Sequence, residues 1–162
     1  MNNSSIPLPF DKLDYQIISC LNEDARMSAA EMEKRTGANQ RTIRKRMNRL
    51  LELGAIRLRG LVEPKVFGYG ISVDIFLSIE EGKEDEILSQ LKQMAPITYL
   101  ATGQNSNELS IEARFQNFES MELFFKKELG SIDGLVMNRY TLVPRIIQNI
   151  DDWLPPEDIF RK

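Results

Sequence analysis

The sequence contains no histidine and a single cysteine, Cys20. Without histidine, catalytic sites built on Ser and His or on Cys and His are excluded, and the commonest metal ligand is missing. One cysteine cannot form an intramolecular disulfide, and the apolar residues around Cys20 predict a small buried side chain in a protein of the reducing cytoplasm. Carboxylate or lysine chemistry stays open, but the composition predicts a protein that is not an enzyme and holds no metal or cofactor.

Long apolar runs are absent as well. The longest are the length of a β-strand, well short of the roughly 20 residues that a membrane-crossing helix needs. The first nine residues, which we treat as a tail, lack the basic start and apolar run of a signal peptide. The 162 residues are 42% hydrophobic and 28% charged. This composition is ordinary for one or two small globular domains, and it predicts no membrane partner.

Acidic residues are nearly absent from residues 34–60, although the chain carries a net charge of -3. This stretch has one acid, Glu52, and a net charge of +8, which leaves -11 on the rest of the chain. Its nine bases are Lys34, Arg35, Arg41, Arg44, Lys45, Arg46, Arg49, Arg57 and Arg59. So polarised a charge distribution indicates a polyanionic partner.

The centre of this basic stretch, residues 40–53, has the periodicity of an amphipathic helix. At 100° per residue, one face is apolar and consists of Ile43, Met47, Leu50 and Leu51. The opposite face consists of Arg41, Thr42, Lys45, Asn48 and Arg49. A solvated surface helix is the alternative interpretation. Such helices usually mix acids with bases at spacings of three or four residues, whereas here the bases are almost alone.

Two shorter helices are predicted before it, over residues 11–22 and 28–36. Ser28 and Glu31 match a capping box, in which the two residues satisfy each other's free amide groups at a helix start. Gly37 to Asn39 then supplies a three-residue turn, with Asn39 as the cap of the basic helix. Two helices joined by so tight a turn predict a helix-turn-helix domain over residues 10–60, although an ordinary helical hairpin is the alternative.

A short strand is predicted over residues 56–62 and would make this domain a winged one. Ile56 and Leu58 would face inward, while Arg57 and Arg59 would face outward, toward either phosphate or water. Residues 61–70 include one proline and two glycines after Glu63 and are interpreted as a linker.

The second half has the alternation of strands. Strands are predicted over residues 71–79, 97–102, 108–115 and 135–143, and helices over residues 83–95 and 118–129. The order βαββαβ predicts a ferredoxin-like domain over residues 71–147, so the chain as a whole is α+β. Helices would cover one face of the sheet, and a second subunit would cover the other, around Phe76, to form a homodimer. A solvated sheet face is the alternative. The C-terminal tail, residues 148–162, either docks on a neighbouring subunit or frays.

From Phe10 to about Ile147 the chain resembles the Lrp/AsnC, or feast/famine, family of transcription factors. The motifs that carry this resemblance are Leu13-Asp14, Asn22-Glu23-Asp24-Ala25-Arg26, Gly37, Thr42-Ile43, Arg46-Met47, Arg49-Leu50, Gly54-Ala55-Ile56, Glu63-Pro64, Phe67-Gly68 and Thr102-Gly103. The resemblance implies a helix-turn-helix DNA reader and an ACT-like domain, also called RAM. That domain dimerises, assembles further into tetramers or octamers, and senses an amino acid or other small metabolite.

The effector site implied by the resemblance falls on Thr102, Gly103, Gln104, Asn105, Ser106 and Asn107. The family usually has an aromatic residue and an aspartate after the glycine, whereas Gln104 and Asn105 stand there in this chain. Without that carboxylate, the loop would bind a different small molecule, or would be a plain hairpin connection.

For DNA, we expect the basic helix to enter the major groove with its N-terminus first. The predicted base contacts are Gln40, Arg41, Arg44 and Lys45, and the predicted phosphate contacts are Thr42, Arg46, Arg49, Arg57 and Arg59. For Arg46 and Arg49, an internal acid is the alternative partner. A dimer would recognise a pseudo-palindromic duplex. Two other functions stay open, namely an enzyme similar to the siroheme decarboxylases and an architectural DNA-binding protein of low specificity.

Overall fold

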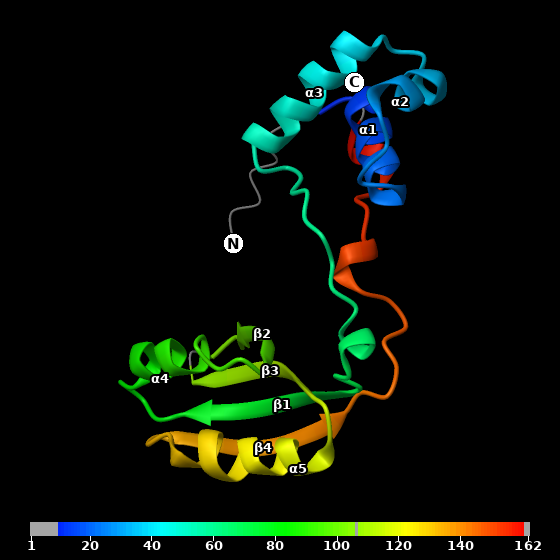
Figure 1. Cartoon of the computed structure of the whole chain (residues 1–162). Coiled ribbons are helices and arrows are strands. Elements are labelled where there is room, and N and C mark those ends of the chain that lie inside the picture. The colour runs from blue at the N-terminus through cyan, green and yellow to red at the C-terminus, as the bar shows by residue number, and fades with distance from the viewer. Residues whose placement is uncertain (1–9, 106, 161–162) are drawn as a thin grey trace. The chain divides into compact units, whose positions relative to one another are not determined.

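The computed structural model describes residues 10–105 and 107–160, so the tail predicted for residues 1–9 lies outside the described residues. The chain forms two compact units. One consists of the residues up to Gly60 together with those from Gln148 onward, and the other of Leu61–Ile147. The chain therefore passes from one unit to the other twice, as its trace in Figure 1 shows. Over the described part of the chain, no helix is long and apolar enough to cross a membrane.

The first unit contains the three predicted helices: α1 (Lys12–Glu23), α2 (Ala29–Thr36) and α3 (Gln40–Glu52). Each begins at a side-chain cap. Asp11 and Ser28 form capping boxes with Asp14 and Glu31, and Asn39 accepts a hydrogen bond from the Thr42 N–H. Because these caps are local, the helix boundaries were predictable to within about two residues.

The core of this unit gathers one apolar side chain or more from each helix. Ile17, Met32, Ile43 and Leu50 are fully buried, and Cys20 is buried beside them as predicted. This packing fixes which face of α3 points outward. The exposed face is the one that carries the basic side chains.

The strand predicted over residues 56–62 is wrong. None of the described residues pairs with this segment in a sheet, and the four strands that do form all lie in the second unit. Ile56 packs against the helical core, but Leu58 is exposed. An alternating sequence becomes a strand only when a second strand supplies hydrogen bonds to it, and this requirement is not visible in the segment itself.

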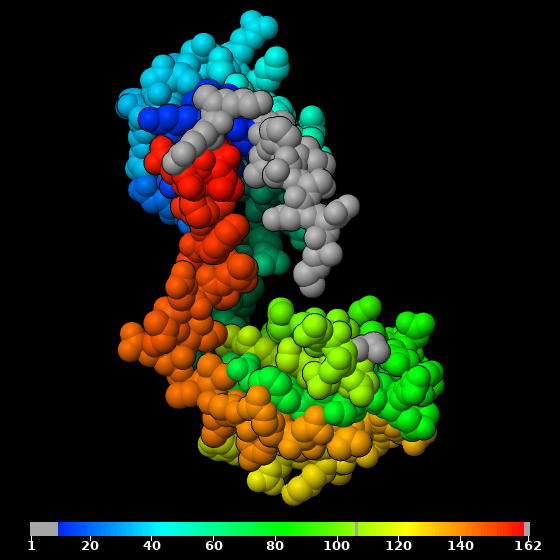
Figure 2. Space-filling model, turned by 180° about the vertical axis from the view of Figure 1, so that it is seen from behind, coloured from blue at the N-terminus to red at the C-terminus, as the bar shows by residue number. Residues whose placement is uncertain are grey.

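The segment after Gln148 returns to the first unit. It contains two 3-10 turns, η4 (Ile150–Asp152) and η5 (Glu157–Phe160), and η5 contacts α1. The side chain of Phe160 is buried there against Phe10 and Tyr15. In Figure 2 this segment, coloured red, lies against the blue residues of α1. We expected either docking on another subunit or a frayed end, and the structure shows packing within the same chain.

The second unit has the predicted order of elements. Its strands are β1 (Ile71–Ile79), β2 (Ile97–Thr102), β3 (Glu108–Phe115) and β4 (Leu135–Leu142), and its helices are α4 (Glu84–Leu91) and α5 (Phe118–Leu123). The strands form one antiparallel sheet in the order β2-β3-β1-β4. This topology is the expected ferredoxin-like one (Figure 1).

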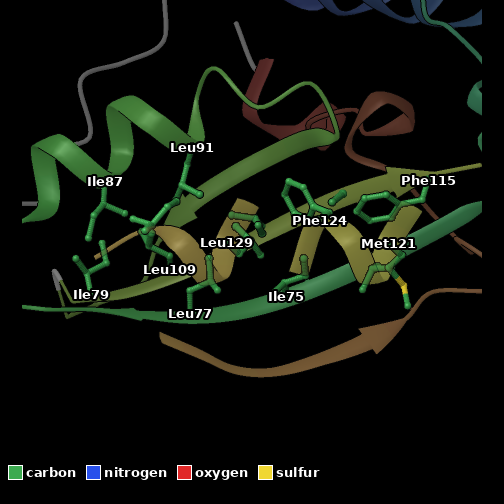
Figure 3. Close-up of a cluster of buried hydrophobic side chains, with 14 residues drawn as sticks. Ile75, Leu77, Ile79, Ile87, Leu91, Leu109, Phe115, Met121, Phe124 and Leu129 are labelled. Atoms are coloured by element: carbon green, nitrogen blue, oxygen red, sulfur yellow. The ribbon is translucent and has the colours of Figure 1, made fainter. Parts of the chain in front are cut away.

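Alternate side chains of β1 and β3 pack with both helices into one core. Figure 3 shows Ile75 and Leu77 of β1 grouped with Leu91 of α4 and Phe124, which follows α5. The other face of the sheet carries the polar positions of the same strands. There the Arg139 guanidinium lies 3.6 Å from the centroid of the Phe76 ring.

Both helices are shorter than predicted. The α-helix α4 ends at Leu91, and the chain continues in a tighter turn in which the Met94 N–H donates to the Leu91 carbonyl, 3.1 Å away. After α5 the chain continues as a π-turn, η2 (Phe124–Glu128), and a 3-10 turn, η3 (Leu129–Ser131). In this wider turn Phe124 is buried, and the Phe125 ring packs against the Tyr140 ring with the two centroids 5.0 Å apart.

Candidate nucleic-acid interface

The turn between α2 and α3 sets the direction of α3. Gly37 ends α2 in the left-handed conformation, with φ of 74°, and its N–H donates to the Glu33 carbonyl at 2.9 Å. Two residues later the Asn39 side chain accepts from the Thr42 N–H, also at 2.9 Å. The backbone is therefore hydrogen-bonded on both sides of the turn, and α3 begins at a fixed residue.

The outer face of α3 presents three exposed bases close to its N-terminus. Arg41, Arg44 and Lys45 are exposed, whereas Ile43 and Leu50 on the opposite face have no exposed area. Three of the four predicted base contacts thus lie together on one accessible surface. Cationic side chains on a helix surface of this kind can reach both base edges and phosphates in a major groove.

Gln40, the fourth predicted base contact, is half-buried and already hydrogen-bonded. Its Nε2 donates to Oε2 of Glu33 at 2.9 Å, and its Oε1 accepts from Arg44 at 3.4 Å. Gln40 is therefore hydrogen-bonded to a carboxylate of α2 on one side and to Arg44 on the other. Glu33 was not among the predicted site residues.

Arg46 is bound to acids of α1. Its guanidinium nitrogens lie 3.0 Å from Asp14 and 2.8 Å from Asp11. The Asp14 side chain is fully buried, and its oxygens accept from both Arg46 and Arg49. The internal acid that we named as the alternative to phosphate is thus present, and it ties α3 to α1.

A signal for this acid exists in the sequence. Asp14, Ile17 and Leu21 share one face of α1, so a carboxylate occupies the first position of an otherwise apolar stripe. A buried carboxylate requires a cationic partner, and α3 is rich in cations. The pKa of the neighbouring Asp11 is raised by burial, but hydrogen bonds from the Asp14 N–H and from Arg46 outweigh burial and leave the pKa below its ordinary value of 3.8.

Arg49 occupies the same surface of α1. Its Nη1 lies 3.4 Å from Asp14, and its guanidinium carbon lies 5.7 Å from the centroid of the Phe10 ring. Its side chain is about one-third exposed. Arg49 therefore already has internal partners, and part of its surface still faces water.

The remaining predicted phosphate contacts differ in their surroundings. Thr42 is half-buried in the first turn of α3, and Arg57 is exposed in the extended segment after the helix. Arg59 is 68% exposed but forms an ion pair with Asp151 of the C-terminal segment, at 3.3 Å. This acid was not part of the predicted site, because nothing local to Arg59 indicates it.

The predicted effector loop joins β2 to β3. Gly103 donates its N–H to the Glu108 carbonyl at 2.7 Å, and the side chains of Thr102, Gln104, Asn105 and Asn107 are exposed. Ser106, the sixth predicted residue, lies outside the described residues. In these respects the loop has the geometry of a hairpin connection. Among residues 10–105 and 107–160, no group of three or more Cys, Asp or Glu side chains could hold a metal.

Comparison with known sequences gives two findings. Residues 10–51 match the model of the AsnC-type helix-turn-helix domain. The chain is 30% identical over 126 residues to the HTH-type transcriptional regulator FL11 of Pyrococcus furiosus, an alignment that spans 77% of this chain and 83% of that protein.

Solved structures share the fold. The structure of E. coli AsnC superposes with a TM-score of 0.76 at 23% identity, covering 87% of this chain and 97% of that one. The transcriptional regulator NMB0573 from Neisseria meningitidis, solved as a complex with L-Met, superposes with a TM-score of 0.79 at 19% identity, covering 86% and 92%. Other proteins of low sequence identity thus share the fold of this chain.

Proposed function

Because the chain belongs to the Lrp/AsnC family of DNA-binding transcriptional regulators, we propose that it binds a pseudo-palindromic operator as a homodimer, with α3 of each subunit in a major groove. The half-sites would then be centred about 34–36 Å apart, or a multiple of that distance. One observation carries this proposal. Arg41, Arg44 and Lys45 form an exposed basic surface at the start of α3, away from its buried face.

We divide the predicted site into three groups, according to the contacts of the side chains. We assign base recognition to Gln40, Arg41, Arg44 and Lys45, at the N-terminal end of α3. We assign phosphate contacts to Thr42, Arg57 and Arg59. Arg46 and Arg49 act mainly through Asp14, because their ion pairs hold α3 against α1. Their partly exposed guanidinium groups would add electrostatic attraction without selecting a sequence.

Selection of bound fragments from a genomic library, followed by footprinting, tests this division. Arg41→Ala or Arg44→Ala should relax the preference at particular base pairs by roughly 1–3 kcal/mol. Arg57→Ala is the matched control, and it should weaken binding to selected and random duplexes alike and reduce the salt slope by about one unit. An unchanged sequence preference in both α3 variants would refute the assignment.

The homodimer is supported by the exposed edge of the sheet in the second unit. β4 lies at the sheet edge and exposes Val136, Tyr140 and Leu142. An edge strand with exposed apolar side chains is suited to pairing with a second subunit. Light scattering of the intact protein tests this part of the proposal, since a monomer at micromolar concentration would contradict it.

A small-molecule effector is the finer part of the proposal. A relative of the same fold was solved with L-Met. In this chain the loop of residues 102–107 offers hydroxyl and amide groups in place of the family's aspartate, which favours a ligand without a free ammonium group. Operator binding measured with and without pooled amino acids and metabolites identifies such a ligand.

An architectural DNA-binding protein differs from a regulator because its affinity for DNA depends little on the base sequence. If random duplex competes as effectively as a selected fragment, the protein coats DNA without choosing a sequence. The enzymatic alternative has no support from the relatives, which are named as transcriptional regulators.

A further inference from the structure

A hydrogen bond to the carboxylate of Glu33 links the two helices of the helix-turn-helix motif across the turn between them. Glu33 lies on α2, and its Oε2 accepts from Nε2 of Gln40, the first residue of α3, at 2.9 Å. The backbone carbonyl of Glu33 also accepts the N–H of Gly37. Both Glu33 and Gln40 are half-buried, so this contact is held within the packed turn and not at the tip of a mobile side chain.

The charges around the Gln40 amide allow only one orientation of its oxygen and nitrogen. A carboxylate can only accept hydrogen bonds, so the amide nitrogen must face Glu33. A guanidinium can only donate, so the amide oxygen must face Arg44, 3.4 Å away. Turning the amide over would place oxygen against carboxylate and nitrogen against guanidinium, which are both repulsive. The two charged partners therefore fix an orientation that is usually ambiguous for glutamine.

The fixed amide still has unused hydrogen-bonding capacity. An amide has two N–H donors and two oxygen lone pairs, so one donor and one acceptor remain after the contacts to Glu33 and Arg44. In the major groove, adenine presents N7 as an acceptor beside its N6 amino group as a donor. One N–H and one lone pair in a fixed order match that edge of the base.

We propose that Glu33 is a specificity-determining positioning residue, which orients Gln40 for adenine and, through Gln40, aligns Arg44 for a neighbouring base. Glu33 itself touches no base. This inference rests on the proposed DNA recognition by α3, and it adds to that proposal a residue of α2 and the identity of one preferred base.

The proposal predicts opposite changes in specific and random binding. In Glu33→Gln the new amide can donate or accept, so Gln40 can adopt either orientation and adenine loses its advantage. The same substitution removes a negative charge from the DNA-facing unit, so the attraction to phosphate grows. A residue that only supports the fold would weaken both kinds of binding together.

The experiment compares wild type, Glu33→Gln, Gln40→Ala and the double variant at one salt concentration. Dissociation constants are measured for a selected fragment, for versions of it with each base pair exchanged, and for random duplex. Glu33→Gln should lose about tenfold in discrimination at the adenine position that Gln40→Ala also affects. The double variant should lose no more than Gln40→Ala alone, since both changes remove one interaction. Random duplex should be bound at least as tightly as by wild type.

Glu52→Gln is the matched control, because it removes the same charge from the exposed C-terminal end of α3. It should leave the discrimination unchanged. Glu33→Ala serves as a second variant, since it removes the acceptor without adding a donor, and circular dichroism checks that both variants fold.

Two outcomes would overturn the inference in different ways. If Glu33→Gln keeps the wild-type discrimination at the Gln40 position, or loses it equally at all positions, Glu33 does not orient Gln40 while the proposed function stands. If wild type itself does not prefer selected fragments over random duplex, the proposed function fails and the inference fails with it.

Discussion

The ring of Phe160 packs against the ring of Tyr15, with the two centroids 5.2 Å apart. Phe10 joins them with its centroid 6.3 Å from that of Phe160, so the C-terminal segment and α1 share a three-ring cluster. Only 4% of Phe160 is exposed. The segment from Gln148 is thus part of the helix-turn-helix unit, and its aromatic side chain is part of that unit's core.

Removing this ring should destabilise the first unit. Phe→Ala in a protein core costs about 3–5 kcal/mol, and we expect about 1–3 kcal/mol for Phe160→Ala because the segment can also undock and leave the helices in place. Differential scanning calorimetry of the intact chain measures the effect. Ile159→Ala, at a half-exposed neighbouring position, is the control. Equal melting temperatures for the two variants would show that the ring cluster contributes no stability.

The ion pair between Asp151 and Arg59 should weaken DNA binding. In Asp151→Asn, Arg59 becomes available to a phosphate, so random duplex should bind more tightly and the salt slope should steepen by about one unit. Asp152→Asn is the matched control, because it removes the same charge from the next residue, which is exposed. The prediction fails if the two variants have the same salt slope.

Replacing Asp14 should lower the free energy of unfolding, whereas replacing Arg41 should affect DNA binding and leave that free energy nearly unchanged. Asp14→Ala leaves Arg46 and Arg49 without a buried acceptor, and we expect a loss of about 1–3 kcal/mol, because both guanidinium groups can still reach water. Arg41→Ala should leave the unfolding free energy within about 0.5 kcal/mol of wild type, as for other surface positions. Urea unfolding measures both values. A stable Asp14→Ala variant would mean that the buried ion pairs do not hold α3 in place.

The first unit should lose stability in acid. The pKa of Glu23 lies below its ordinary value of 4.5 because of the hydrogen bond from Arg35, and that of Glu31 lies below it because of the Ser28 hydroxyl. A carboxyl whose folded pKa is depressed binds its proton more readily in the unfolded chain. Its stabilisation is therefore complete above the unfolded pKa and is lost as the pH falls through the folded pKa.

The unfolding free energy should accordingly fall as the pH is lowered from about 5 toward 3. Urea titrations at successive pH values measure this fall. In Glu23→Gln the decrease should be shallower than in wild type, because one of the titrating groups is gone. An acid limb of unchanged steepness in that variant would exclude a contribution from the pair with Arg35.

The elements that the sequence predicted correctly are those with local signals. Apolar residues at helical spacing mark α1, a capping box marks α2, and alternation marks β1 and β3, so each could be assigned from a few neighbouring residues. The incorrect strand at residues 56–62 had the right alternation but no partner strand among the described residues. Its failure shows that a strand is a property of two segments.

The candidate site was likewise predictable only where local sequence signals determine it. The exposed bases of α3 follow from the helical period, which places Arg41 and Lys45 opposite Ile43 and places Arg44 at the side of the helix, outside the apolar face. The ion pairs of Arg46 and Arg59 are less accessible to sequence reasoning, because they join residues far apart in the chain. The position of Asp14 in an apolar stripe indicates that it needs a cationic partner but not which one, and nothing near Arg59 indicates Asp151.

The packing of Phe160 also sets an order of events during synthesis. Domains generally fold as units, with the N-terminal one first, while the ribosome is still translating. Here the first unit needs residues that are translated only after Leu61–Ile147. Until then α1 has no ring from the C-terminal segment to pack against Phe10 and Tyr15, so this unit, although first in the sequence, cannot be completed before the whole of the second unit has been translated.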